Sequence, residues 1–164
     1  MIKFENVSVT YPGGVEALKD LNLEIKDGDF IIIVGLSGAG KSTLLRTVNN
    51  LVKPSTGSVY LEGKNVTSAK KKELKKIRSQ IGMIFQTFNL VNRSTVLKNV
   101  LTGRLSNIST IRSILGLWPK DQKEMAFEAL NQVEILEKAY VRASNLSGGQ
   151  QQRVGIARAL SQKP

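Results

Sequence analysis

The 164-residue chain contains no cysteine and no histidine. Without cysteine it has neither a disulfide framework nor a thiolate metal site, and without histidine it lacks the commonest general base and metal ligand. No apolar run approaches the roughly 18 residues of a membrane span, and the start "MIKFENVSV" lacks the charged-then-apolar order of a signal peptide. We therefore expect a soluble cytoplasmic protein whose chemistry uses lysine, hydroxyl, amide, carboxylate and backbone groups.

Basic residues are in excess, because 24 Lys and Arg stand against 13 Asp and Glu, a formal net charge of +11. Such a balance suits a nucleic acid, an anionic membrane surface or a phosphate-rich ligand. The charge is densest in "KKKELKKIR", residues 70–78, where six of nine residues are basic. Since Leu74 and Ile77 lie three residues apart, this segment predicts a short helix. It is either a solvated helix face or an electrostatic footprint for a polyanion.

Alternating apolar residues predict an antiparallel β layer in the N-terminal part of the chain. The alternation slips in phase around Glu5 and Asn6, is interrupted by the turn "YPGG" and resumes over residues 21–25. The unbroken apolar run from Phe30 to Val34 predicts instead a strand buried on both faces, as in a parallel sheet. "SVYLEG" and "QIGMIFQ" are further strand candidates, so two kinds of sheet are expected in an α/β fold.

The segment from Phe88 to Lys138 has a helical character. Pro119 is well placed at a helix start, and Met125, Leu130 and Val133 follow it with helical spacing. The sequence therefore predicts a core with the β layer over residues 1–87 and a helical subdomain over residues 88–164, which together make one domain.

The strongest motif is "GLSGAGKS", which lies between the predicted buried strand and an amphipathic helix. Its glycines let the backbone wrap around phosphates, and the N–H groups at the helix start supply positive potential. Lys41 is expected to reach the β and γ phosphates, Ser42 to ligate Mg²⁺, and Thr43 to lie near the α phosphate. The motif indicates a nucleoside triphosphate but not which base, and the candidate phosphate-binding residues of the loop are Gly35, Leu36, Ser37, Gly38, Ala39, Gly40, Lys41, Ser42 and Thr43.

Two residues outside this loop are candidates with open alternatives. Gln86 ends an apolar strand candidate, where it either has a structural role or reaches the metal or the attacking water. Tyr11 is either a half-exposed aromatic residue of a strand or a ring that stacks on adenine.

A second glycine loop, "LSGGQ" from Leu146 to Gln150, opens into a helix, and Ser147 is a good N-cap candidate. Free N–H groups at a helix start suit an anion. Without a lysine, however, this loop is a weak phosphate site by itself.

These motifs, in this order, resemble those of the ATP-binding cassette family, the motor subunits of ABC transporters. In that resemblance residues 35–42 are Walker A, Gln86 is the Q-loop glutamine, Tyr11 is the A-loop aromatic residue and "LSGGQ" is the signature. The resemblance implies ATP and Mg²⁺ as ligands, with Ser42 and Gln86 at the metal. It also implies a head-to-tail homodimer in which Ser147, Gly148, Gly149 and Gln150 contact the ATP held by the partner.

The family's fold is a P-loop NTPase with an N-terminal antiparallel β layer, a RecA-like parallel core and an α-helical subdomain. The stretch from "LTGRLSNIST" to "GIARAL" is similar to the ATP-binding subunit of bacterial phosphonate importers, which implies a phosphonate-type oxyanion as cargo. Implied partners are membrane-spanning permease subunits, received around Gln86 to Arg112, and indirectly a substrate-binding protein. The implied location is the cytoplasmic face of the membrane, and no nucleic acid partner is expected.

The chain departs from the family pattern in one respect. That pattern continues past "ALSQKP" into a strand ending in Asp-Glu and a later histidine, and none of these is present. We therefore expect a C-terminally truncated cassette with only part of the parallel core, apolar strand faces open to solvent, and impaired ATP hydrolysis. The alternatives are a cassette of another transporter, a non-transport cassette of DNA repair or the ribosome, a nucleotide-binding fragment without turnover, or a nucleic-acid binder through residues 70–78.

Overall fold

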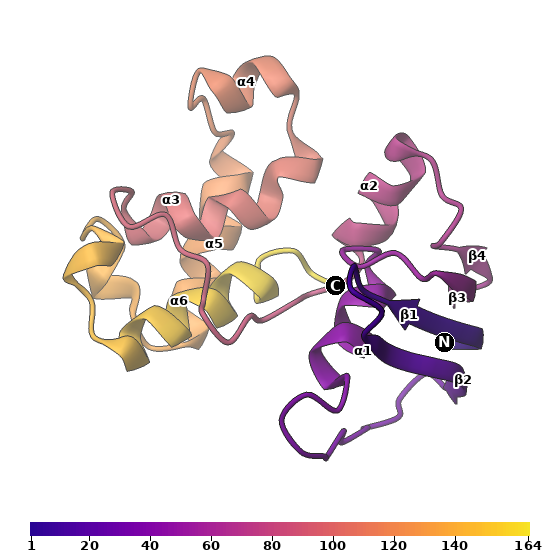
Figure 1. Ribbon diagram of the computed structural model, residues 1–164. Helices are drawn as coiled ribbons and strands as arrows, with labels where there is room; N and C mark the ends of the chain where they lie inside the picture. Colours follow the sequence, from indigo (N-terminus) through magenta and orange to yellow (C-terminus); the bar gives the residue numbers. More distant parts are fainter. The chain divides into compact units, whose positions relative to one another are not determined.

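A computed structural model describes residues 1–164. The chain forms two compact units, Met1–Arg78 and Ser79–Pro164 (Figure 1). The boundary expected from the sequence, after residue 87, lies inside the second unit.

A four-stranded antiparallel sheet forms the centre of the first unit. Its spatial order is β2-β1-β3-β4, so β1 lies between β2 and β3. The strands are β1 (Ile2–Thr10), β2 (Glu16–Ile25), β3 (Thr56–Leu61) and the short β4 (Lys64–Asn65). The antiparallel layer and the strand in "SVYLEG" are therefore confirmed.

The predicted phase slip in β1 is a bulge at Asn6. The register with both neighbouring strands shifts just after Phe4 and Glu5, and Asn6 has a φ of 49°. The Asn6 N–H, which the bulge takes out of the ladder, donates to the Asn22 side-chain oxygen at 2.9 Å. A Cβ on Gly57 of β3 would lie 2.2 Å from the Asn6 carbonyl oxygen, so only glycine fits opposite the bulge.

Two helices accompany this sheet, α1 (Lys41–Val48) and α2 (Lys71–Ser79). Helix α1 packs against β2 and β3. The helix predicted from "KKKELKKIR" is confirmed as α2, where Ile77 is fully buried. The buried apolar core of the unit consists of Phe4, Val7, Val9, Leu44, Val59, Leu61, Val66 and Ile77.

The strand predicted over residues 30–34, as in a parallel sheet, and the strand candidate "QIGMIFQ" are not strands in the structure. Residues 30–34 and 81–86 have no ladder hydrogen bonds, and Phe30 and Val34 are 87% and 85% exposed. The prediction of a strand buried on both faces was wrong here, because the sheet contains β1 to β4 alone and offers no parallel neighbour to residues 30–34. An apolar run without a pairing partner stays extended and open to solvent.

The second unit is helical, as predicted for the middle of the chain. Helix α5 begins directly after Pro119, which confirms the predicted start. The α-helices of this unit are α3 (Val96–Leu101), α4 (Thr110–Ile114), α5 (Lys120–Gln132) and α6 (Gly148–Leu160). Short 3₁₀ turns are η1 (Thr102–Asn107), η2 (Leu136–Lys138) and η3 (Ala143–Asn145).

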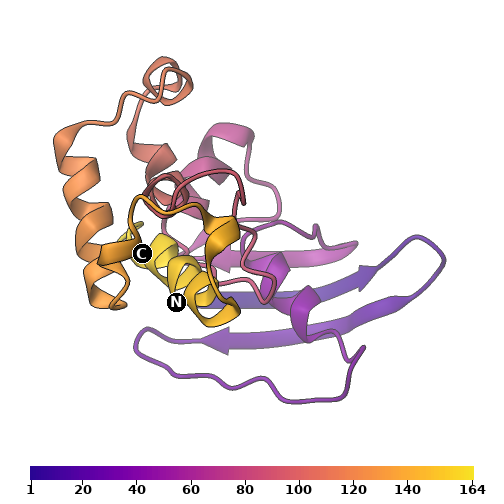
Figure 2. The same cartoon turned by 90° about the vertical axis from the view of Figure 1, so that its left-hand side faces the viewer.

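Helices α3, α5 and α6 pack on one another around the core of this unit (Figure 2). The predicted apolar residue Leu130 is fully buried, and Val133 packs against the core from its edge. The single tryptophan, Trp118, also packs against this cluster. The buried core residues are Val96, Leu97, Val100, Leu101, Ala126, Ala129, Leu130, Ile135, Ala139, Leu146, Val154 and Ala157.

Truncating the core of the second unit should destabilise it strongly. We expect Leu130→Ala to lower the free energy of unfolding by about 2 to 5 kcal/mol, because it removes buried methyl groups and leaves a cavity. Urea titration followed by Trp118 fluorescence measures this loss. The matched control is Leu136→Ala, since Leu136 is 39% exposed. Equal losses in the two variants would contradict the assignment of the core.

Candidate functional site

The glycine loop of residues 35–42 leads directly into α1. It turns at Ser37 and Gly38, and the Ala39 N–H donates to the Leu36 carbonyl at 3.2 Å. Helix α1 has no side-chain cap at Gly40, and its ladder begins with the Leu44 N–H on the Gly40 carbonyl at 2.9 Å. The N–H groups of its first turn are therefore free of side-chain acceptors, as an anion site at a helix start requires.

The end of the loop is pressed against the sheet at Gly40. A Cβ on this residue would lie 2.2 Å from the Ala17 carbonyl oxygen of β2, and its φ is 81°. Both the space and the backbone conformation exclude other residues. The antiparallel sheet thus fixes where α1 begins.

Lys41 is folded over the loop that precedes it. Its ammonium donates to the carbonyls of Gly35 at 2.7 Å and Leu36 at 2.6 Å. Both acceptors are backbone oxygens of the loop itself, which places the positive charge at the loop.

Tyr11 lies beside the first turn of α1. It follows β1 in the turn to β2, is 36% exposed, and its hydroxyl lies 3.1 Å from the Thr43 hydroxyl. Thr43 is buried within the unit. The structure therefore brings two of the predicted nucleotide residues into contact although they are far apart in the sequence.

The second glycine loop has a different helix start. Ser147 accepts from the Gln150 N–H at 3.3 Å, and the Ser147 N–H donates to the Gln150 side-chain oxygen at 3.0 Å. This reciprocal capping box confirms the predicted N-cap. Gly148 and Gly149 are exposed and have open space where a Cβ would lie. Another molecule can therefore come close to the backbone of this loop at Gly148 and Gly149.

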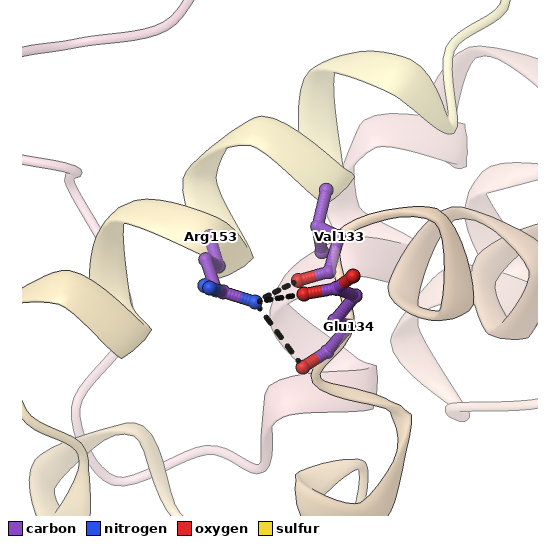
Figure 3. A network of polar contacts seen from close by, with 3 residues as sticks. All are labelled: Val133, Glu134 and Arg153. Carbon is purple, nitrogen blue, oxygen red and sulfur yellow. Dashed lines mark hydrogen bonds and ion pairs between the residues drawn. The ribbon is translucent and has the colours of Figure 1, made fainter.

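Arg153 ties α6 to the end of α5 (Figure 3). One guanidinium nitrogen donates to the Val133 carbonyl at 2.9 Å and to the Glu134 carbonyl at 3.4 Å, and it lies 3.2 Å from the Glu134 carboxylate. Val133 is the C-cap of α5, where carbonyls lack helical partners. The guanidinium therefore supplies hydrogen-bond donors and positive charge to the C-terminal carbonyls of α5. The same contact holds α6 in place one turn after the second glycine loop.

Arg104 donates hydrogen bonds to backbone carbonyls at the C-terminal end of α6. Its buried guanidinium donates to the carbonyls of Ser161 at 2.8 Å and Gln162 at 3.2 Å, and to the Gln122 side-chain oxygen at 2.8 Å. The helix of the second glycine loop is thus held near both of its ends by arginine side chains that sequence reasoning missed.

Gln86 is exposed and lies in a turn, and the backbone just after it is bonded to α6. Arg158 of α6 donates to the carbonyls of Phe88 at 2.5 Å and Asn89 at 2.8 Å. Those two residues have φ values of 55° and 48°, so the turn is strained for side-chain-bearing residues. Partial burial lowers the pKa of Arg158 from its ordinary value. The only sequence signal for Arg158 was an arginine inside the apolar "GIARAL".

The loop of residues 35–42 fits a nucleoside triphosphate. It offers an uncapped helix start, a lysine and glycines that carry no Cβ toward a ligand. No group of three or more carboxylates able to hold a metal ion exists in the structure. A Mg²⁺ ion here would therefore take most of its ligands from phosphate and water, with the Ser42 hydroxyl as the protein ligand beside the loop. Gln86, the other predicted metal residue, belongs to the second unit, Ser79–Pro164.

Solved structures with this arrangement are ATP-binding cassettes. MJ0796, whose dimer was solved in a post-hydrolysis state bound to ADP and Pi, matches 100% of this chain and 71% of its own, with a TM-score of 0.88 and 40% identity. CbiO1 from Clostridium perfringens, part of the cbiONQ complex, matches 99% of this chain and 62% of its own, with a TM-score of 0.79 and 31% identity. The fold class, an α/β P-loop NTPase of the ABC type, is confirmed.

Sequence comparisons define the family. The ABC transporter family model matches residues 18–164, so the chain belongs to the ABC transporter ATP-binding cassettes. It is 60% identical over 163 residues to the phosphonates import ATP-binding protein PhnC of Bacillus thuringiensis subsp. konkukian, and 53% identical over 164 residues to PhnC 3 of Halalkalibacterium halodurans. These matches cover 99% and 100% of this chain but 63% and 64% of those relatives. No helix is both long and apolar enough to cross a bilayer.

Removing the Arg158 guanidinium should loosen the turn after Gln86. In Arg158→Gln, amides of residues 86–90 should exchange hydrogen at least about 100 times faster, because two bonds from a charged donor, each contributing about 1.5 to 3 kcal/mol, are lost. Hydrogen exchange with mass spectrometry measures this change. The control is Arg112→Gln, an exposed arginine of α4. Unchanged exchange in residues 86–90 would refute the positioning role.

Proposed function

We propose that this chain binds Mg-ATP at the loop of residues 35–42 and acts as the ATP-binding part of an ABC import system. The observation that carries the proposal is the uncapped start of α1 with Lys41 folded over its loop, in a chain 60% identical to a phosphonates import ATP-binding protein. Such a loop supplies backbone N–H groups and one mobile cation to a triphosphate.

Each residue near this loop has a distinct proposed role. The Lys41 ammonium would exchange its two backbone carbonyls for oxygens of the terminal phosphates, and the Ser42 hydroxyl would ligate Mg²⁺. The Tyr11 ring, held beside α1 through Thr43, would stack on the adenine. Gln86, the Q-loop glutamine of the resemblance, is proposed to position the metal or the attacking water.

The second glycine loop is proposed to act on the ATP of another copy in a head-to-tail homodimer. Its exposed glycines and uncrowded backbone allow close approach of an anion. However, the loop has no lysine, and its capping box already uses the N–H groups of Ser147 and Gln150. Such a loop is too weak to hold a triphosphate alone, and it contributes when a partner presents one.

We further propose import of a phosphonate-type oxyanion through membrane-spanning permease subunits at the cytoplasmic face of the membrane. The relatives at 53% to 60% identity are phosphonates import ATP-binding proteins, which supports both the direction and the cargo. The segment from Gln86 to Arg112 is the proposed contact with the permease, and a substrate-binding protein would act through the permease.

Replacing the lysine of the loop should weaken nucleotide binding. We expect Lys41→Ala to raise the dissociation constant for Mg-ATP about 10- to 100-fold, because a charge-assisted hydrogen bond worth about 1.5 to 3 kcal/mol is lost. Retention of radiolabelled ATP at equilibrium measures it. The control Lys53→Ala removes an exposed lysine with the same change of net charge. Equal retention by Lys41→Ala and the control would refute the assigned site.

A negative charge in the second glycine loop should prevent ATP-dependent pairing of copies. Gly149→Asp lies in the first turn of α6, where a carboxylate favours the helix, and there is open space for the side chain, so the fold should persist. It should nevertheless raise the dissociation constant of the Mg-ATP-dependent dimer at least about tenfold, because it repels the partner's phosphates. Sedimentation velocity with and without Mg-ATP measures this.

The matched control is Ser144→Asp, which places the same charge on an exposed residue of the preceding turn η3. If both variants pair as well as the unchanged chain in Mg-ATP, the second loop does not serve a partner's nucleotide.

A further inference from the structure

Helix α2 carries the densest positive charge of the molecule, and nothing in the ATP site uses it. Lys70 precedes the helix, and five of its nine residues are Lys or Arg. Lys70, Lys71, Lys72 and Lys75 are all exposed, and a single acidic residue, Glu73, lies among them. These four exposed lysines therefore give the helix a cationic surface.

The helix is fixed to its own unit through its other side. Ile77 is fully buried and Leu74 is half-buried. The Arg78 guanidinium donates to the carbonyls of Asn49 at 2.8 Å and Asn50 at 2.9 Å. The apolar face and the arginine are thus already used inside the unit, and the exposed cations of the helix are lysines.

The lysines also surround a shallow depression of about 540 Å³ that extends to β4. Its rim contains Lys64 of β4 together with lysines of α2, and Ile77 forms part of its floor. The lining residues are Lys64, Lys70, Lys72, Glu73, Lys76 and Ile77. Four of the six lining residues are therefore lysines, from two segments of the chain.

We propose that this lysine face, Lys64 with Lys70 to Lys76, binds an anionic phospholipid surface. Clusters of four to eight basic residues on a helix attract the headgroups of acidic lipids, and each contributes additively. Lysine ammonium groups suit phosphate headgroups as compact point charges without fixed orientation. Since the apolar face of α2 is buried in its own unit, binding is electrostatic and does not insert side chains into the bilayer.

A nucleic acid fits this face less well. Residues 62–79 contain no aromatic side chain on which bases could stack, and the one arginine of the helix, Arg78, is bonded to backbone carbonyls. Stacking and bidentate arginine contacts are what proteins add to phosphate contacts when they bind nucleic acids. The face offers phosphate contacts only, in a compact patch.

Vesicle binding tests the proposal on the full chain without nucleotide, so the result is independent of the ATP site. The probe is vesicles of phosphatidylcholine with about a third phosphatidylserine, compared with vesicles of phosphatidylcholine alone, in a co-sedimentation assay. We expect binding to the anionic vesicles only, falling steeply as the salt concentration rises. In the quadruple variant Lys70→Gln, Lys71→Gln, Lys72→Gln, Lys75→Gln the partition coefficient should fall at least about 100-fold, since each lysine near the surface contributes roughly fivefold.

The control removes the same charge from exposed lysines on four separate segments: Lys26→Gln, Lys53→Gln, Lys98→Gln and Lys123→Gln. This variant should keep partitioning within about tenfold of the unchanged chain, because its charges do not act at one surface. Circular dichroism of both variants checks that the helices remain. Equal losses in the two variants, binding to neutral vesicles, or tighter binding to single- or double-stranded DNA than to anionic vesicles at the same salt would overturn the proposal.

Discussion

The polar start of a helix is the constraint on which both glycine loops depend. The first N–H groups of any helix lack internal acceptors and must find them elsewhere. Helix α1 begins at Gly40 with no side-chain cap, whereas α6 begins with a capping box between Ser147 and Gln150. The first N–H groups of α1 are therefore open to a ligand, whereas α6 uses the N–H groups of Ser147 and Gln150 in its own capping box. This difference in the hydrogen bonding of the first N–H groups, more than the similar glycine content, separates the loop proposed to hold phosphate from the loop proposed only to approach it.

Arginine and lysine have separate uses in this chain. Arg104 and Arg153 bind backbone carbonyls at helix ends, and Arg158 binds those of the turn after Gln86. The planar guanidinium reaches two acceptors at once and tolerates partial burial. The lysines of α2 instead remain exposed. The large positive net charge is thus partly structural and partly available to partners, and composition alone does not separate the two.

Local signals predicted much of this structure. The hairpin of β1 and β2, the bulge near Asn6, helix α2, the start of α5 after Pro119 and the cap at Ser147 all follow from patterns within a few residues. The strand expected at residues 30–34 failed because a strand exists only with a neighbour, which its own residues cannot supply. The arginine contacts were missed for a related reason. Their acceptors are backbone carbonyls distant in sequence, and every residue carries one.

The bulge at Asn6 has a consequence for how the sequence can vary. Its carbonyl lies against Gly57, and its N–H is taken by Asn22, so three strands are locked at one point. Insertion or deletion of a residue on either side would move the bulge away from the one glycine that accommodates it. Length variation among homologues should therefore collect in the turns that follow these strands, and the middle of each strand should keep its length even where its side chains diverge.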